Sequence, residues 1–304
     1  MSTKRNIALL ACPGGAKTTF GLSAPGVEQH IWGSSEETTR ENFPDRIKSG
    51  DILDPVKFNW YDCLDEKEKA KFTDESVSEI TIGELTKVAR AKNIAKYRRY
   101  LYKLKSEHKL DDKRKTLFMD NGTAFSQDFE DYVRVVYGAE FATKEGNFNS
   151  IAFAIKFKNE YADFMRMFLD LPYNCIVSYH IAMTLDEATA AKADFMKDTA
   201  KGIKYPKEWQ PMVMGQAKYL LAGLYDFAFY MWTEENAGQP TRFLAKLEAD
   251  DASVGMAKGR IQPFLNPRKI EFPKNRAFDY LEEALKVYRE TGTPFDNDKI
   301  KGVK

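Results

Sequence analysis

The stretch Ala11–Thr19, "ACPGGAKTT", decides how this chain is interpreted. It has the spacing of the phosphate-binding loop G-x-x-x-x-G-K-[ST], except that alanines, Ala11 and Ala16, occupy both framework glycine positions. The preceding "RNIALL" predicts a buried strand, and the following "KTTFGLSAPG" predicts a short helix that ends near Pro25. A strand, a glycine turn and Lys-Thr at a helix start form the context in which this loop binds phosphate.

Such a loop directs backbone N–H groups and a helix N-terminus at phosphate oxygens. Alanine keeps its N–H but loses easy access to positive φ, and we expect Gly14 and Gly15 to supply that freedom. Lys17 would reach the β- and γ-phosphates of ATP, and the Thr18 hydroxyl would bind Mg²⁺. The alternative is a glycine turn before an ordinary surface helix. The predicted nucleotide contacts are Cys12, Pro13, Gly14, Gly15, Ala16, Lys17, Thr18 and Thr19.

Composition narrows the class of protein. The chain has 304 residues, 43% hydrophobic and 30% charged, which is typical of one large or two modest globular domains. No apolar run approaches a membrane span and no secretory signal opens the chain, so we expect a cytoplasmic protein without a membrane partner. Three scattered cysteines argue against a disulfide framework, and the three histidines form no zinc motif. Because the net charge is +1, nucleic-acid binding would rely on local patches.

Strands and helices alternate along the chain, which predicts an α/β fold with a mostly parallel sheet flanked by helices. Ligands of such sheets bind at the carboxyl ends of the strands. The stretches "LYDFAFYMWTE" and "TRFLAKLE", joined by "ENAGQ", predict a C-terminal β-hairpin. The other expected strands are 29–37, 55–62, 115–123 and 174–180, and the expected helices are 74–110, 125–136, 151–171 and 276–290.

A second motif, "TLFMD", is an apolar strand that ends in Asp120. An acid at the end of a strand that comes after a phosphate loop in the chain fits a Walker B motif, whose carboxylate orients Mg²⁺. The alternative is an aspartate that caps the next helix, and the sequence "DNGT" permits either role.

Three further groups fit a nucleotide site less specifically. Glu36 follows the second expected strand and could polarise the attacking water, with Glu37 as the competing choice and a surface acid as the alternative. His180 ends the apolar strand "CIVSYH" and could sense the γ-phosphate or simply cap the strand. Lys258 and Arg260 in "MAKGR" would face the same way on a strand, as two cations that clamp phosphate or as a solvated basic turn.

The order of these motifs resembles that of phage-encoded, minimal RecA-like ATPases of single-strand annealing and recombination. The matching pieces are "CPGGAKTT", "TLFMDNGT", "NCIVSYHIA", "WQPMVMGQAKYLLAGLYDFAFYMW" and "VGMAKGRIQP", and together they span most of the chain, with 64–114 fitting least well. The resemblance implies a single RecA-like P-loop domain over 1–304, with 64–114 as a basic, helical insertion.

The same resemblance implies a Mg²⁺-dependent ATPase that forms a homo-oligomeric ring or filament on single-stranded DNA in the host cytoplasm. A single-strand-binding protein is a further expected partner. As in RadA and KaiC proteins, Lys258 and Arg260 would act across a subunit interface. The alanines Ala11 and Ala16 put the rate of hydrolysis in doubt more than binding. A helicase-loading or other DNA motor, and a nucleotide-gated interaction protein with little hydrolysis, remain the alternatives.

In RecA-like cores two loops face the DNA, and by position these would be 137–150 and 183–209. Lysines that follow the backbone, with aromatic rings such as Phe141 and Phe148 for stacking, suit sequence-independent single-strand binding. The basic stretch Lys87–Lys115, with twelve Lys/Arg against three acids and Tyr97, Tyr100 and Tyr102 between them, is an alternative footprint or a solvated helix face. The predicted DNA contacts are Lys144, Lys192, Lys197, Lys201, Lys204 and Lys207.

Overall fold

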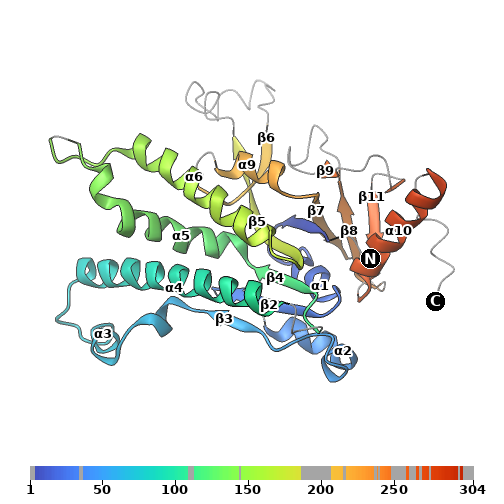
Figure 1. Cartoon of the computed structure of the whole chain (residues 1–304), viewed down its shortest axis with the longest axis horizontal. Helices are drawn as coiled ribbons and strands as arrows, with labels where there is room; N and C mark the ends of the chain where they lie inside the picture. Colours follow the sequence, from blue (N-terminus) through green and yellow to red (C-terminus); the bar gives the residue numbers. More distant parts are fainter. Residues whose placement is uncertain are drawn as a thin grey trace.

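A central sheet organises the computed structural model of the chain (Figure 1). The structure describes residues 4–33, 37–108, 113–143, 145–185, 207–214, 217–235, 238, 240–247, 258–259, 265–266, 269–273, 275–293 and 295–296. Within them a ten-stranded sheet has the order β11-β8-β7-β1-β5-β4-β2-β3, with β6 paired to β5 and β9 paired to β7. The α/β class and the mostly parallel sheet are therefore as predicted.

The bounds of the elements follow in chain order. The strands are β1 (Asn6–Ala11), β2 (Val27–Trp32), β3 (Val56–Phe58), β4 (Thr116–Asp120), β5 (Asn174–Leu185), β6 (Lys207–Pro211), β7 (Phe227–Glu234), β8 (Arg242–Lys246), β9 (Lys258–Gly259), β10 (Leu265–Asn266), β11 (Lys269–Phe272) and β12 (Phe295–Asp296). The helices are α1 (Lys17–Leu22), α2 (Pro44–Lys48), α3 (Glu66–Ala70), α4 (Glu79–Glu107), α5 (Gly122–Tyr137), α6 (Ser150–Leu169), α9 (Ala217–Leu224) and α10 (Ala277–Thr291), with 3-10 turns η1 (Glu37–Asn42), η2 (Trp60–Cys63) and η3 (Gly138–Phe141).

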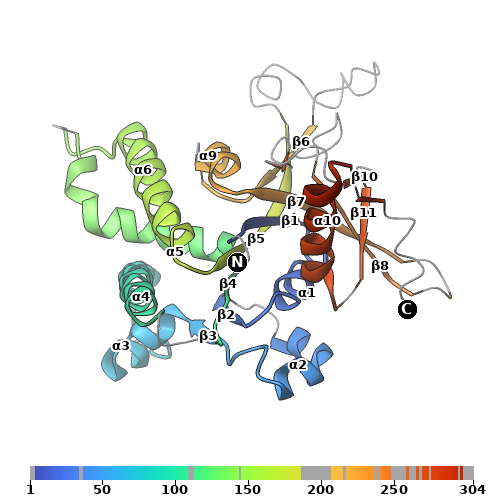
Figure 2. The ribbon, with the colours of Figure 1, turned by 45° about the vertical axis from the view of Figure 1, so that its right-hand side comes forward.

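Two hydrophobic cores lie on opposite faces of the sheet. On β1, Ala8 and Leu10 join the core beneath α4, α5, α6 and α9, whereas Ile7 and Leu9 join the core beneath α1 and α10. Figure 2 shows these two groups of helices on either side of the strands. Burial on both faces explains why the central strands are continuous apolar runs rather than alternating ones.

The strands β3, β2, β4, β5, β1 and β7 are mutually parallel, and their carboxyl ends therefore meet at one edge. β8 runs antiparallel to β7, which is the predicted hairpin, and β11 extends it. β5 lies between β1 and β4. This arrangement brings the glycine loop after β1, His180 on β5 and Asp120 on β4 to the same edge.

The predicted end of the strand at His180 is wrong, because β5 continues to Leu185. Its extension pairs antiparallel with β6, and Leu185 lies opposite Lys207. The two ends of the expected loop 183–209 are thus strand residues. A two-stranded ladder satisfies the backbone hydrogen bonds of these residues, so that no continuous apolar pattern is needed to form it. The sequence analysis also missed α9, which packs on α6.

The stretch 74–110 is largely helical, as predicted, in the form of the 29-residue helix α4. Ser78 caps its start by accepting a hydrogen bond from the Thr81 N–H. Tyr97 is fully buried and the Tyr100 hydroxyl donates to Glu28 at 2.6 Å, so Tyr102 alone of the three tyrosines is exposed. Tyr97 is therefore part of the core, and contact between this stretch and DNA stays a prediction. That 64–114 forms an insertion stays a prediction.

Candidate functional site

The loop between β1 and α1 has a backbone conformation that its sequence did not suggest. Ala16, the N-cap of α1, lies in the left-handed region with φ 61° and ψ 17°, and Gly14 has φ 79°. Ala16 is the only non-glycine residue with positive φ in the described part of the chain. Gly14 has the positive φ expected of it, whereas Gly15 does not, and Ala16 adopts a left-handed conformation as well. A left-handed L-residue costs about 1–2 kcal/mol, so the loop is held there by its surroundings.

Gly15 serves the loop through its small size rather than through positive φ. A Cβ atom at Gly15 would lie 2.4 Å from the Ala11 Cβ and 3.2 Å from the Met231 carbonyl oxygen. Its N–H donates to the Cys12 carbonyl at 3.1 Å, which closes the turn. Ala11 is the last residue of β1 and is fully buried, so an alanine fits a position that needs no positive φ.

Lys17 opens α1 and turns its ammonium group back onto the loop. Its Nζ donates to the carbonyl oxygens of Ala11 at 3.0 Å and Cys12 at 2.9 Å, and lies 3.4 Å from His180 Nδ1. Burial lowers the pKa of Lys17 to about 8, against the opposing pull of the nearby Asp120 carboxylate. A buried cation with a lowered pKa at a helix N-terminus is an environment that an anionic ligand would stabilise.

Asp120 accepts three hydrogen bonds from three different elements. Thr18 Oγ1 and Gln29 Nε2 each donate to its Oδ2 at 2.9 Å, and Ser178 Oγ donates to its Oδ1 at 2.7 Å. The side chain of the next residue, Asn121, caps α5 by accepting from the N–H of Ala124 at 2.7 Å. Of the two roles that "DNGT" permitted, the cap therefore belongs to Asn121.

Gln29 and Ser178 were not among the residues predicted for the site. Each is a polar residue inside a buried strand, "VEQHIW" and "NCIVSYHIAMTL". That polarity was a usable signal, because a fully buried polar side chain is seldom found without a hydrogen-bonding task.

His180 lies beside the loop rather than at the end of its strand. It is paired with Ala11 in the parallel register of β1 and β5, and its N–H donates to Thr123 Oγ1 at 3.0 Å. Burial, followed by the charge of Lys17, lowers the pKa of His180. The imidazole is therefore neutral near pH 7, which suits a hydrogen-bonding group better than a second cation.

Several residues predicted for catalysis or DNA binding lie elsewhere in the structure or outside the described residues. Lys207 and Lys258 are strand residues, in β6 and in β9, where Lys258 pairs with Ala228. Phe141, expected to offer a stacking surface, is buried, whereas Phe148 is 52% exposed. Glu36, Lys144, Lys192, Lys197, Lys201, Lys204 and Arg260 lie outside the described residues.

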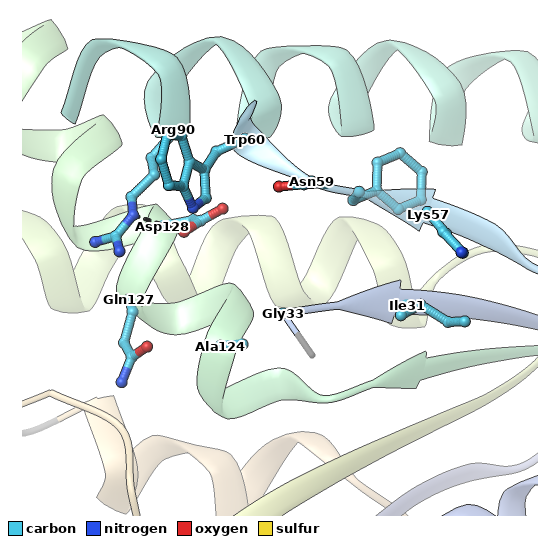
Figure 3. A pocket seen from close by; sticks show the side chains of 10 residues that line it. Ile31, Gly33, Lys57, Asn59, Trp60, Arg90, Ala124, Gln127 and Asp128 are labelled. Atoms are coloured by element: carbon cyan, nitrogen blue, oxygen red, sulfur yellow. Dashed lines mark ion pairs between the residues drawn. The ribbon is translucent and has the colours of Figure 1, made fainter. Parts of the chain in front are cut away.

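A separate pocket of about 620 Å³ lies between β2, β3, α4 and α5 (Figure 3). On one wall Arg90 Nε lies 3.3 Å from Asp128 Oδ1, and Asn93 Nδ2 donates to Asp128 Oδ2 at 3.2 Å. Burial raises the pKa of Asp128 to about 7. We call Asp128, Arg90 and Asn93 the Asp128 cluster. This cluster was not predicted from the sequence, because its members come from two helices, α4 and α5, that are far apart along the chain.

The oxygen atoms around Asp120 fit a magnesium ion better than a transition metal. Mg²⁺ prefers oxygen ligands and is usually held by one or two protein groups together with substrate phosphates. The Thr18 hydroxyl and the Asp120 carboxylate are 2.9 Å apart and can supply those groups. Within the described ranges no three His, Cys, Asp or Glu side chains gather as a metal site, which such a shared ion does not require.

Comparison with known proteins adds no family to this geometry. No protein-family model matches the chain, and no curated protein matches it. Among the helices of the described ranges, none has the length and apolar character that a bilayer crossing demands.

Proposed function

We propose that this chain is an ATP-binding and ATP-hydrolysing protein with a RecA-like core that acts on single-stranded DNA in recombination or annealing. One observation carries the proposal. Lys17, Thr18, Asp120 and His180, from α1, β4 and β5, converge beside a glycine turn at the carboxyl edge of a parallel sheet. That edge is where open α/β sheets bind their ligands.

Each of these side chains has a distinct task in the proposal. When ATP binds, Lys17 releases the loop carbonyl oxygens and contacts the β- and γ-phosphates, with which its ammonium group makes stronger, charge-assisted hydrogen bonds. Thr18 and Asp120 hold Mg²⁺, which when bound neutralises charge on those phosphates. Because His180 Nδ1 faces the Lys17 ammonium group at 3.4 Å, the neutral imidazole carries its proton on Nε2, which can donate to a γ-phosphate oxygen.

The remaining roles follow the motifs of the sequence. Glu36, with Glu37 as the alternative, activates the attacking water, and Lys258 and Arg260 complete the site of a neighbouring subunit in a ring or filament. DNA is bound mainly by the lysines of 183–209, with Lys144 as a further contact. Coupling between the nucleotide site and DNA binding is supported by β5, which carries His180 and continues to Leu185, opposite Lys207 on β6. If His180 moved on binding the γ-phosphate, the movement would be transmitted directly to the two-stranded extension formed by β5 and β6.

The test is multiple-turnover ATP hydrolysis by the pure protein, with and without single-stranded DNA. The proposal predicts hydrolysis that DNA stimulates and that Lys17→Ala abolishes. Hydrolysis stimulated only by a partner protein would favour the helicase-loading alternative. Tight ATP binding without turnover would favour the nucleotide-gated interaction protein. No binding of ATP at all would refute all three.

A further inference from the structure

Three polar side chains interrupt an otherwise apolar face of the sheet. On the side that packs against α1, neighbouring strands contribute Val27, Phe118 and Ile176 to the core. On the same face lie Gln29 on β2, Asp120 on β4 and Ser178 on β5, which are 0%, 3% and 0% exposed. Burying polar groups is unfavourable unless they are hydrogen-bonded, so their joint placement needs a reason beyond packing.

Gln29 is the member whose hydrogen bonding is incomplete. Its Nε2 donates to Asp120 Oδ2 at 2.9 Å, which fixes the orientation of the amide because only the nitrogen can donate to a carboxylate. Its Oε1 is buried and has no hydrogen-bond partner among the described residues. Both amide atoms are bonded to one carbon, so this acceptor belongs to the same group that holds the Asp120 carboxylate. A buried acceptor without a donor is uncommon in folded proteins and points to a ligand or water.

We propose that Gln29 is a positioning residue for the metal-binding carboxylate. Its Nε2 holds Asp120 in place, and its Oε1 accepts a hydrogen bond from a water molecule bound to Mg²⁺. The inference rests on the proposed function, because it requires Asp120 and Thr18 to share a magnesium ion with ATP.

The hydrogen bonds of Asp120 explain why a positioning residue is needed. Thr18 and Gln29 both donate to Oδ2, and Ser178 donates to Oδ1. If the Thr18 oxygen bound a cation, Oδ2 would lose that donor. Gln29 and Ser178 then keep one hydrogen bond on each oxygen, so the carboxylate stays oriented. Groups that orient a metal ligand in this way commonly change metal affinity 10- to 100-fold.

A structural role for Gln29 makes a different prediction. If Gln29 only satisfied the buried carboxylate, its loss would resemble the loss of Ser178, which also supplies one donor. Gln29→Met keeps the approximate volume and removes both donor and acceptor. Ser178→Ala removes a donor to Asp120 and leaves the Gln29 acceptor intact, so it is the matched control.

The experiment measures binding of a non-hydrolysable ATP analogue by calorimetry, with Mg²⁺ and with a chelator, for wild type and both variants. The ratio of the two affinities isolates the contribution of Mg²⁺ from general effects on the loop. We expect Gln29→Met to reduce this ratio about 10- to 100-fold, to leave chelator affinity nearly unchanged, and to reduce the ratio more than Ser178→Ala does. Mn²⁺ in place of Mg²⁺, followed by electron paramagnetic resonance, should show the same loss of bound metal.

The outcomes separate this inference from the proposed function. A folded Gln29→Met protein with the wild-type ratio, or with the same loss as Ser178→Ala, overturns the role of Gln29 alone. A wild-type protein that binds no analogue overturns both. If Gln29→Met does not fold, Gln29→Asn, which retains the amide but draws it back by one methylene, carries the same prediction and the same refutation.

Discussion

Two buried carboxylates, Asp120 and Asp128, precede and follow Asn121 along the chain and have different surroundings. The Asp128 carboxylate is matched by a guanidinium group, since Arg90 Nε lies 3.3 Å away and Arg90 also pairs with Asp131 at 2.9 Å. The donors to Asp120 in the described part of the chain, from Thr18, Gln29 and Ser178, are all neutral. A guanidinium group thus contacts the Asp128 carboxylate directly, whereas Asp120 has neutral hydrogen-bond donors and the nearby charge of Lys17, at the place where we propose that Mg²⁺ binds.

The largest expected difference between the two carboxylates is in ATP hydrolysis. Asp120→Asn should reduce turnover by about 100-fold or more, because it removes the charge that holds Mg²⁺ against the phosphates. Asp128→Asn is the matched control. It should change turnover by less than about 5-fold, because Asp128 pairs with Arg90 and is not part of the proposed nucleotide site. Steady-state kinetics of both folded variants checks this. Equal losses would contradict the distinction between the two sites.

The Asp128 cluster should show itself in the pH dependence of stability. Burial raises the pKa of Asp128 from 3.8 to about 7, so the folded state binds a proton more tightly than the unfolded state. Stability should therefore fall as pH rises from about 4 to about 7, by up to about 4 kcal/mol, with the opposing charge of Arg90 already included in the shift. Urea unfolding of wild type and Asp128→Asn at several pH values measures this pH dependence. The fall in stability that Asp128 causes should be absent from the variant.

The pH range matters because Glu28 acts in the opposite direction. Hydrogen bonds from His30 and Tyr100, with the charge of Arg114, overcome burial and lower the pKa of Glu28 to about 2. Its stabilisation is complete above the unfolded value of 4.5 and is lost as pH falls toward 2. Measurements between about pH 5 and about pH 8 therefore report Asp128 without Glu28. A slope that is identical in wild type and Asp128→Asn would contradict the assigned pKa shift.

The smallest expected effect concerns the loop and leaves the Asp128 cluster untouched. Ala16→Gly should stabilise the fold by about 1 kcal/mol or less, because glycine accepts φ 61° without strain but gains entropy when unfolded. Gly14→Ala is the opposite test, at φ 79° with nothing within 4 Å of the added Cβ, and should destabilise by about 1 kcal/mol. Thermal unfolding measures both. Destabilisation by Ala16→Gly would mean that the left-handed assignment is wrong.

The sequence predicted those parts of the site that a local pattern encodes. Lys17 and Thr18 are recognisable because strand, turn and helix follow one another, and Asp120 and His180 because each lies in or at the end of an apolar strand. Gln29 and Ser178 were missed because their task depends on which strands are neighbours. That β5 lies between β1 and β4 is a long-range fact that spacing along the chain does not contain.

Other differences have local physical causes. The left-handed conformation of Ala16 was not predicted, because alanine by itself disfavours positive φ. Phe141 was taken for a loop residue, yet η3 folds it back onto Phe153, with ring centroids 5.3 Å apart, as burial of a large ring favours. The extension of β5 was missed because antiparallel pairing with β6 stabilises it from a distant segment.

The central claim is that Lys17 lies in a nucleotide-binding loop, and binding of a non-hydrolysable ATP analogue with Mg²⁺ tests it most directly. Calorimetry should show saturable binding by wild type and at least about 10-fold weaker binding by Lys17→Ala, since a charge-assisted hydrogen bond contributes about 1.5–3 kcal/mol. Circular dichroism should show that the variant keeps the fold. Binding of equal strength by Lys17→Ala, or no binding by wild type, would contradict the account.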